Sequence, residues 1–248
     1  MYDRLAGVYD WLVPGALLTP AGSAAAFDIV LDELPAGARV LDCACGTGTL
    51  AVGMALRGFE VTASDASGEM VERTRALAAE HGAAVVAMVR VWEELGGGPF
   101  DAVLCVGNSI THARDRRAAL AAMHRVLRDE RGGSGASGRG SGLLALTSRT
   151  WERPQEEGEE VVERHGRRAR VTHTWHPGAL EVAVTFDDDG TTYAERLAYW
   201  PFTHDELQAE LLATGFEPVA STFGPEAARY LVTARRARSG ERTSTAAG

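Results

Sequence analysis

Short apolar runs rich in β-branched residues alternate with longer stretches of helical periodicity through the first half of the chain. The apolar runs predict five strands, over residues 39–43, 60–64, 84–89, 101–106 and 143–148. Helical spacing occurs between them, from the glycine turn to about Arg57 and over residues 68–81 and 112–128. Because helices of this length join parallel strands through right-handed crossovers, the pattern predicts a parallel sheet covered on both faces.

The pattern changes after residue 150. Residues 159–200 alternate polar and apolar positions without helical periodicity, and the run DDDG at 187–190 predicts a turn between two strands. A small antiparallel insert, or lid, is therefore expected after the fifth strand. Thr203 is a candidate N-cap for a helix reaching Thr214, with Glu206 at the capping-box position. Two final strands are expected near residues 216–222 and 229–234.

The length of 248 residues fits one elaborated domain, since domains average ~150 residues. The predicted fold class is α/β: a Rossmann-like, mostly parallel seven-stranded sheet with helices on both faces and a small antiparallel insert after the fifth strand. We divide the domain into N-terminal lid helices, a cofactor-binding core, the insert, and a closing helix with strands, at residues 1–38, 39–150, 151–202 and 203–235. The polar tail 236–248 is expected to be disordered. Residues 132–142, with six Gly and three Ser, are interpreted as a tolerated surface insertion.

The composition and the net charge exclude several classes of enzyme and binding partner. All 25 basic residues are Arg, and the absence of Lys excludes Schiff-base enzymes and Walker-type phosphate loops. A net charge of −9 disfavours nucleic acid as a partner. No apolar run approaches the ~20 residues that cross a bilayer, and residues 1–4 open no signal peptide, so a cytoplasmic protein without a membrane partner is predicted. Three sparse cysteines indicate neither a disulfide framework nor a metal site.

The strongest local signal is a glycine turn at the carboxyl end of the first predicted strand. Gly46 and Gly48 follow Asp42 in the run VLDCACGTG, where open α/β sheets bind ligands. Asp65 stands near the end of the second strand, 19 residues after Gly46. A carboxylate at that place accepts hydrogen bonds from both hydroxyls of a ribose. The combination predicts a nucleoside-containing ligand.

A dinucleotide is the competing ligand, because the glycines formally satisfy a GxGxxG/A fingerprint. A pyrophosphate needs those glycines directly at the strand end, whereas Asp42 and three further residues intervene here. A carboxylate at that point repels a pyrophosphate and suits a cation, such as the sulfonium of an amino-acid-bearing cofactor. A nicotinamide oxidoreductase is further disfavoured by the absence of a Tyr-x-x-x-Lys motif. The other alternative is that the glycine motif forms a tight turn that binds no ligand.

The chain resembles the class I S-adenosylmethionine-dependent methyltransferases from about residue 2 to residue 235. Within them it is most similar to the glycine/sarcosine N-methyltransferases and related small-molecule amine methyltransferases. The motifs that carry the likeness are residues 40–48 (VLDCACGTG), 61–70 (VTASDASGEM), 100–112 (FDAVLCVGNSITH) and 197–201 (LAYWP).

The resemblance implies S-adenosyl-L-methionine as the cofactor and assigns residues to it. Those expected to shape the methionine pocket are Asp42, Ala44, Gly46 and Gly48. Asp65 would hold the ribose, Ala66 and Met70 would pack on the adenine, and Val91 and Trp92 would flank it. Residues under the transferred methyl group would be Val106, Gly107, Asn108 and Ser109. Val91 departs from the family, which usually places a polar residue there.

The resemblance also implies an acceptor site above Asn108. Arg149 matches the arginine that holds an acceptor carboxylate in that family. The alternative interpretation is that Arg149 forms an ion pair at the surface. His112 either accepts the proton of the amine or orients it by a hydrogen bond, unless it only caps a helix. Tyr2 and Tyr9 match tyrosines that fold over the active site, or they pack the N-terminus. The family's arginine for the cofactor carboxylate is missing, since residues 12–38 contain no basic residue.

The sequence therefore predicts an S-adenosylmethionine-dependent N-methyltransferase acting on the amine of a small molecule. His112, Asn108 and Tyr9 are its candidate catalytic residues, and Asn108, Arg149, Tyr2 and Tyr9 its candidate acceptor-binding residues. The acceptor is either a secondary-metabolite intermediate, such as an aminosugar or antibiotic precursor, or an amino acid such as glycine or sarcosine. The alternatives are an O- or C-methyltransferase on the same fold and a non-catalytic adenosyl-ligand-binding module. Assembly into a homo-oligomer stays open.

Overall fold

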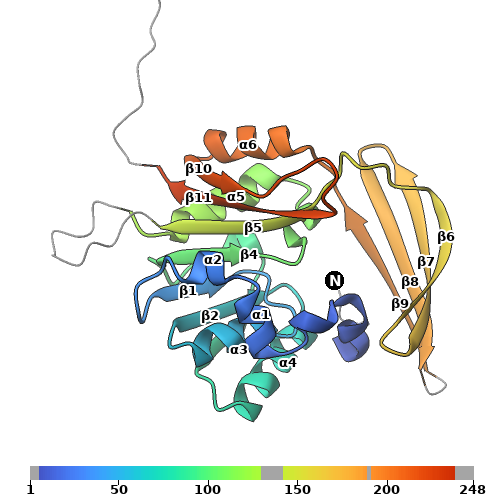
Figure 1. The fold of residues 1–248 in the computed structure, drawn as a ribbon, viewed down its shortest axis with the longest axis horizontal. Coiled ribbons are helices and arrows are strands. Elements are labelled where there is room, and N and C mark those ends of the chain that lie inside the picture. The colour runs from blue at the N-terminus through green and yellow to red at the C-terminus, as the bar shows by residue number, and fades with distance from the viewer. Residues whose placement is uncertain (1–5, 130–141, 189–190, 238–248) are drawn as a thin grey trace, which may run out of the picture.

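A seven-stranded sheet forms the centre of the molecule, with strand order β10-β11-β5-β4-β1-β2-β3 (Figure 1). The computed structural model describes residues 6–129, 142–188 and 191–237. The parallel strands are β1 (Arg39–Asp42), β2 (Glu60–Asp65), β3 (Val85–Val89), β4 (Ala102–Cys105) and β5 (Leu143–Arg149). The two antiparallel strands are β10 (Phe216–Ser221) and β11 (Arg229–Arg236). The predicted mostly parallel sheet is confirmed.

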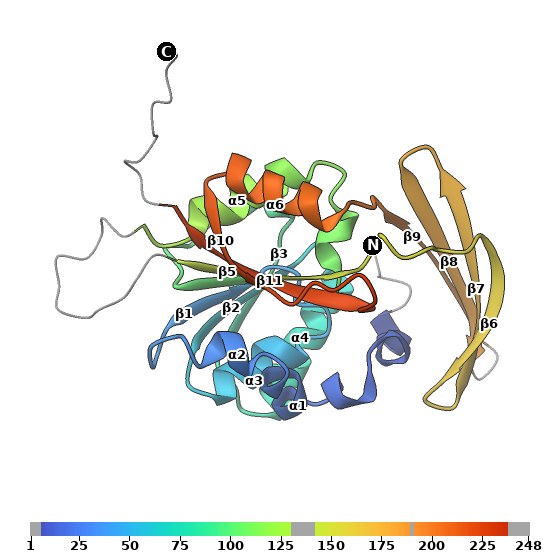
Figure 2. The same cartoon turned by 45° about the horizontal axis from the view of Figure 1, so that its top comes forward.

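Helices cover both faces of this sheet, as Figure 2 shows. On one face lie α1 (Pro20–Ala25), α2 (Asp28–Leu31), α3 (Thr49–Leu56) and α4 (Gly68–Glu80). On the other lie α5 (Arg116–Val126) and α6 (His204–Ala213). Short 3-10 turns complete the elements: η1 (Ala6–Leu12), η2 (Gly15–Leu17), η3 (Trp92–Glu94) and η4 (Ser109–His112).

Local capping chemistry sets two helix starts. The Thr203 side chain accepts from the Glu206 backbone N–H at 3.1 Å, and the Glu206 carboxylate accepts from the Thr203 N–H at 2.7 Å, which is the predicted capping box. The helix expected from residue 112 instead begins at Arg116. Asp115 caps it by accepting from the Ala118 N–H at 2.9 Å, and η4 precedes it as a separate turn.

The insert after β5 is a separate four-stranded antiparallel sheet, as predicted. Its strands run in sequence order: β6 (Gly158–Arg164), β7 (Arg167–His176), β8 (Ala179–Asp188) and β9 (Thr191–Tyr199). Figures 1 and 2 place this sheet beside the N-terminal segment, at one end of the parallel sheet. Of the predicted turn at 187–190, residues 189 and 190 lie outside the described part of the chain.

One hydrophobic core joins the two sheets. It contains Leu144 and Leu146 of β5, Phe186 of β8 and Leu197 of β9, and it also takes in Trp11 of η1. A second cluster, with Val40, Leu50 and Met54, fills the α1–α3 face. The insert and the N-terminal segment are therefore packed on the parallel sheet by apolar burial.

Arg236 belongs to β11, so the polar tail begins later than expected because the strand continues its pairing with Phe216. Residues 238–248 of that tail, and the Gly/Ser segment up to residue 141, lie outside the described residues.

Within the described residues no helix combines the length and apolar character that a membrane crossing requires. In the same part of the chain no cluster of His, Cys, Asp and Glu is arranged to hold a metal ion.

Candidate active site

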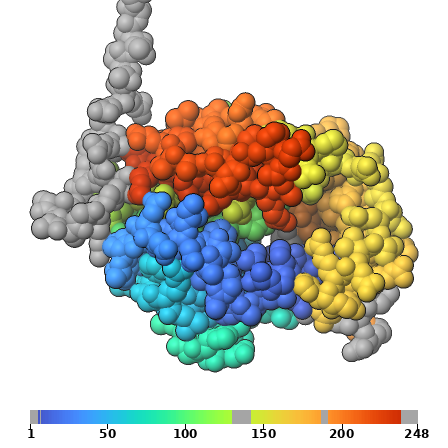
Figure 3. Space-filling model, viewed as in Figure 1, coloured from blue at the N-terminus to red at the C-terminus, as the bar shows by residue number. Residues whose placement is uncertain are grey.

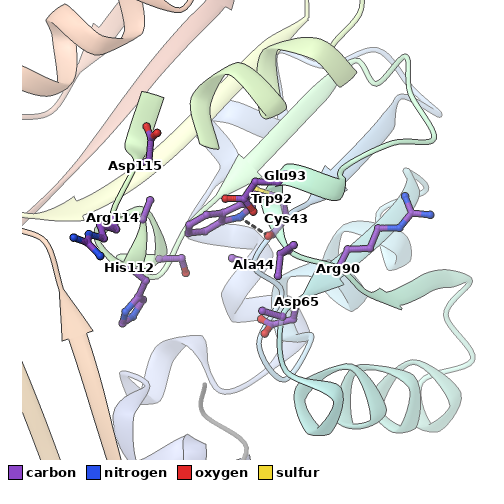
Figure 4. Close-up of a pocket in the computed structure, with 13 residues that line it drawn as sticks. Cys43, Ala44, Asp65, Arg90, Trp92, Glu93, His112, Arg114 and Asp115 are labelled. Atoms are coloured by element: carbon purple, nitrogen blue, oxygen red, sulfur yellow. Dashed lines mark hydrogen bonds between the residues drawn. The ribbon is translucent and has the colours of Figure 1, made fainter. Parts of the chain in front are cut away.

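A cavity of about 370 Å³ lies at the carboxyl ends of the parallel strands (Figure 4). This edge is where open α/β sheets bind their ligands. Predicted site residues in its wall are Ala44, Asp65, Ala66, Val91, Trp92, Ser109 and His112. Further wall residues, which the sequence did not single out, are Cys43, Arg90, Glu93, Ala113, Arg114 and Asp115. Each of the six lies within three residues of a predicted site residue, and this proximity is the sequence signal that could have found them.

Asp65 is fixed by backbone donors on both of its oxygens. The Gly46 N–H donates to Oδ2 at 3.0 Å, and the Ser67 N–H donates to Oδ1 at 2.9 Å. Thr74 of α4 holds the same loop by donating its hydroxyl to the Gly46 carbonyl at 3.0 Å. An ionised carboxylate has about four acceptor positions, and Asp65 uses one on each oxygen to order the glycine loop.

The two glycines of the loop face different neighbours. Both have positive φ, +52° at Gly46 and +87° at Gly48, a region that favours glycine. A Cβ on Gly48 would lie 2.7 Å from the Thr74 side chain, so this glycine is required by the packing of α4 against the loop. A Cβ on Gly46 would lie 3.5 Å from the ring of Tyr9, so the N-terminal segment covers the loop there.

Asp42 is buried at the end of β1, beneath the glycine loop. Its Oδ1 accepts only a long hydrogen bond, 3.5 Å from the Ala44 N–H. Burial raises the pKa of the Asp42 carboxyl to about 7, with the nearby Asp65 charge adding to the rise. A carboxylate poised in this way binds a cation favourably, because the cation offsets the cost of ionising it.

The far wall of the cavity is built around Trp92. Its indole N–H donates to the Cys43 carbonyl at 2.9 Å, and this bond holds the ring of this first residue of η3 against the end of β1. Val91 beside it is 43% exposed and presents an apolar surface. Met70 of α4 is 1% exposed, and it is buried in the core rather than in the cavity wall. The structure thus brings Val91 and Trp92, but not Met70, to this wall.

The turn after β4 positions the other side of the site. Asn108 adopts a left-handed conformation with φ +69°, and its Oδ1 accepts from the backbone N–H of Arg149 at 2.9 Å. The Gly107 N–H donates to the Thr147 hydroxyl at 2.9 Å, and the Ser109 hydroxyl donates to the Val106 carbonyl at 2.7 Å. The first two bonds tie the turn to the end of β5, and the third closes the turn on itself.

His112 ends η4 and faces the cavity (Figure 4). Its Nδ1 lies 2.8 Å from the Ala198 carbonyl, which only accepts, so Nδ1 carries the hydrogen and Nε2 the lone pair. Burial lowers the pKa of the imidazole to about 4, against the opposing effect of the Ala198 hydrogen bond. The imidazole is therefore neutral at physiological pH.

An aromatic group extends from His112 to Arg149. The rings of His112 and Tyr199 lie 4.6 Å apart, and those of Tyr199 and Trp151 lie 5.8 Å apart. The guanidinium of Arg149 stacks 4.9 Å above the Trp151 ring. Trp151 and Tyr199 were not among the predicted site residues. Tyr199 lies in the family-like LAYWP motif, and Trp151 lies two residues after Arg149. Either position in the sequence could have indicated a site residue.

The N-terminal segment closes over this group. Burial raises the pKa of Tyr9 to about 12, with the Asp65 and Tyr199 charges adding to the rise and Arg229 opposing it. The Tyr9 ring itself lies against the glycine loop, 3.5 Å from the place that a Cβ on Gly46 would take. Figure 3 shows the surface hollowed where the N-terminal segment (dark blue) meets the core. Tyr2 lies outside the described residues.

Residues 40–130 match the family described as Methyltransferase domain. A glycine/sarcosine N-methyltransferase of Parasynechococcus marenigrum is 36% identical over 199 residues, 75% of this chain and 65% of that protein. Another, of Aphanothece halophytica, is 32% identical over 201 residues, 75% of this chain and 68% of that protein. The chain belongs to the class I S-adenosylmethionine-dependent methyltransferases. It spans about two thirds of the length of these curated relatives.

Other members of the methyltransferase family share parts of the chain or its fold. A ubiquinone biosynthesis O-methyltransferase of Xanthomonas axonopodis is 40% identical over 97 residues, 38% of this chain and 40% of that protein. A methyltransferase of Streptomyces caelestis superposes with a TM-score of 0.77 at 20% identity, covering 95% of this chain and 97% of that one. An amino pentose methyltransferase of Micromonospora echinaspora, with S-adenosylmethionine bound, superposes with a TM-score of 0.65 at 24% identity, covering 88% and 92%.

The cofactor of this methyltransferase family, S-adenosylmethionine, suits the residues present. Asp65 is an anchored carboxylate for the ribose hydroxyls, and the wall formed by Val91 and Trp92 suits a flat apolar base. Asp42 would receive the cationic methionine end, because a buried carboxyl with a raised pKa gains from a positive charge nearby. The donor set therefore matches a ligand that combines a nucleoside with a cationic amino acid.

Proposed function

We propose that this methyltransferase transfers a methyl group to the amine of a small molecule. The acceptor is a secondary-metabolite intermediate, such as an aminosugar or antibiotic precursor, or an amino acid such as glycine or sarcosine. The observation that carries the proposal is the neutral His112 imidazole at the cavity wall, whose Nε2 lone pair suits an amine N–H. Tyr199 packs against His112, and Trp151 and Arg149 follow it in the same aromatic group.

The cofactor, when bound, supplies an electrophilic methyl carbon at its sulfonium centre. The residues of this chain need only align a neutral amine with it and exclude water. His112 has a pKa of about 4, far too low to take a proton from an ammonium group of pKa ~10. His112 therefore orients the amine by accepting a hydrogen bond, and the apolar surroundings favour loss of the ammonium proton before attack.

O-methylation is less well supported by the same residue. An acceptor hydroxyl has to be ionised by a base, and a His112 imidazole with a pKa of about 4 is a weak one. The O-methyltransferase relative matches only 38% of this chain, whereas the two glycine/sarcosine N-methyltransferases match 75%. The amino pentose methyltransferase likewise acts on a sugar that carries an amine.

The test is release of S-adenosylhomocysteine, followed by mass spectrometry with glycine, sarcosine, a panel of aminosugars and their hydroxyl analogues. We expect turnover with an amine and none with the matched hydroxyl compound. The His112→Ala variant should lose roughly tenfold in turnover through the missing hydrogen bond, with the Kd of S-adenosylhomocysteine within threefold of wild type. His81→Ala is the control, because His81 is exposed after α4.

Three results would contradict the proposal or its mechanism. Methylation of the hydroxyl compounds alone would make the chain an O-methyltransferase. Thermal stabilisation by S-adenosylhomocysteine without turnover of any amine would point to a binding module. Full activity of His112→Ala would remove His112 from the mechanism.

A further inference from the structure

Thr74 of α4 is a buried polar residue that contacts the glycine loop at several places. The residue is 0% exposed. Its hydroxyl donates to the Gly46 carbonyl at 3.0 Å, and the Cys45 Sγ lies 3.4 Å from the same hydroxyl oxygen. A Cβ on Gly48 would lie 2.7 Å from the Thr74 side chain, so the loop packs closely on this residue there as well. Thr74 therefore meets the loop from Cys45 through to Gly48.

The hydrogen bonds around the Thr74 hydroxyl run in one direction. A backbone carbonyl only accepts, so the single hydroxyl hydrogen of Thr74 is given to Gly46. The Cys45 thiol is then the donor to the Thr74 oxygen. Burial raises the pKa of the Cys45 thiol, with the Asp42 charge adding to the rise, so the thiol keeps the hydrogen that this bond needs. Removal of the Thr74 hydroxyl would take a partner from the thiol and from the carbonyl at once.

Both backbone polar groups of Gly46 are bound by side chains. Its N–H donates to the Asp65 carboxylate at 3.0 Å, and its carbonyl accepts from Thr74. Gly46 has a φ of +52°, and a glycine has more backbone conformations open to it than any other residue. Because the two bonds lie on either side of the Gly46 Cα, together they select one of these conformations. Asp65 itself lines the cavity (Figure 4).

Helix α4 holds Asp65 as well as Gly46. The Ser67 N–H donates to the second oxygen of Asp65 at 2.9 Å, and the Ser67 hydroxyl caps α4 by accepting from the Met70 N–H at 3.2 Å. Ser67 and Thr74 are seven residues apart, which is about two helical turns, so they lie on one face of the helix. Both are buried. One rigid element therefore sets the spacing between the Asp65 carboxylate and the glycine loop.

The cofactor of this family joins a nucleoside to an amino acid in one molecule. Asp65 is the carboxylate that suits the ribose hydroxyls, and the glycine loop is expected at the amino-acid end. A ligand that spans both places gains from both contacts only when their spacing matches its own length. A ligand that carries the nucleoside without the amino acid depends on Asp65 alone.

We propose that Thr74 is a positioning residue for the cofactor, which sets the glycine loop relative to Asp65 so that both ends of the cofactor are bound together. Thr74 acts through Gly46 and does not line the cavity. Its role is the same whichever acceptor the protein methylates, so it is independent of the amine as the methyl acceptor.

The experiment compares two ligands in calorimetric titrations. S-adenosylhomocysteine carries the nucleoside and the amino acid, whereas methylthioadenosine has a methyl group in place of the amino-acid part. Thr74→Val keeps the shape of the side chain and removes the hydroxyl. We expect this variant to bind S-adenosylhomocysteine at least ~tenfold more weakly than wild type does, and methylthioadenosine within ~threefold. Thr74→Ser, which restores the hydroxyl, should bind both ligands within ~threefold of wild type.

Thr214→Val is the matched control. The Thr214 hydroxyl donates to the Glu210 carbonyl at 2.8 Å at the end of α6, so this variant loses a bond of the same kind away from the glycine loop. It should bind S-adenosylhomocysteine as wild type does. Circular dichroism shows whether each variant is folded at the temperature of the titration. Thr74→Ala, which favours helix formation, gives the same comparison of the two ligands should Thr74→Val not fold.

Several results would overturn the proposal. Binding of S-adenosylhomocysteine within threefold of wild type in Thr74→Val would show that the hydroxyl does not matter to the cofactor. Equal weakening of both ligands would limit Thr74 to the nucleoside site or to general stability. A loss in Thr74→Ser as large as that in Thr74→Val would assign the effect to the methyl group. Failure of both Thr74→Val and Thr74→Ala to fold would make Thr74 a residue of the core, and undetectable binding of methylthioadenosine by wild type would mean that the nucleoside is not held independently of the loop.

Discussion

Replacement of Gly48 by alanine tests whether this glycine serves packing rather than ligand approach. Its φ of +87° costs an L-residue ~1–2 kcal/mol. The new Cβ would lie 2.7 Å from the Thr74 side-chain atoms and 2.8 Å from the Thr74 Cα, which belongs to the backbone of α4. Overpacking of this kind adds ~1–3 kcal/mol, so Gly48→Ala should lose about 2–5 kcal/mol of unfolding free energy.

Gly58 provides a matched control at the other end of α3. Its φ is +88°, and a Cβ there would meet nothing within 4 Å, so Gly58→Ala should cost only the backbone term of ~1–2 kcal/mol. At ~2–4 °C per kcal/mol for a chain of this size, thermal unfolding should show a Tm loss of about 4–20 °C for Gly48→Ala and about 2–8 °C for Gly58→Ala. Equal losses for the two variants would refute the argument from Thr74.

Further predictions concern the two carboxyls of the site and the pH. Folding raises the pKa of Asp42 from 3.8 to about 7. The contribution of this carboxyl to stability is therefore complete below pH 3.8 and is lost as the pH rises through 7. In urea titrations, the unfolding free energy of Asp42→Asn relative to wild type should increase by about 2–3 kcal/mol between pH 5 and pH 8. A constant difference across that range would contradict the raised pKa. Asp65→Asn should weaken S-adenosylhomocysteine binding by ~10–100-fold in calorimetry, because charged hydrogen bonds to the ribose are lost, whereas Glu60→Gln at the opposite, exposed end of β2 should bind as wild type does. Unchanged affinity in Asp65→Asn would remove Asp65 from the ribose site.

Elements with strong local signals could be predicted from the sequence. The capping box of α6 needs only Thr203 and Glu206, three residues apart, and β3 and β4 are continuous apolar runs. The predicted start of α5 was wrong because two local features override the helical spacing of residues 112–115. Asn108 takes a left-handed conformation that opens η4, and Asp115 caps the helix that follows.

The acceptor side of the site depended on contacts that the sequence does not encode locally. Arg149 was predicted by its motif, but its neighbours Tyr199 and Arg229 come from β9 and β11, and only the strand register brings them together. Met70 has the position of a family residue, and it is buried in α4 and is not one of the residues that line the cavity. A pattern of apolar positions shows which face is buried without distinguishing core from cavity wall.

The anchoring of the N-terminal segment has a consequence for how the protein is made. The Trp11 indole N–H donates to the Arg167 carbonyl across a sequence separation of 156 residues, and Asp10 pairs with the Arg167 guanidinium at 2.9 Å. During synthesis the segment therefore leaves the ribosome long before its docking surface exists, since chains emerge N-terminus first. The parallel strands β1 to β5 precede Arg167 in the chain, so the cofactor half of the site is synthesised before its cover can close.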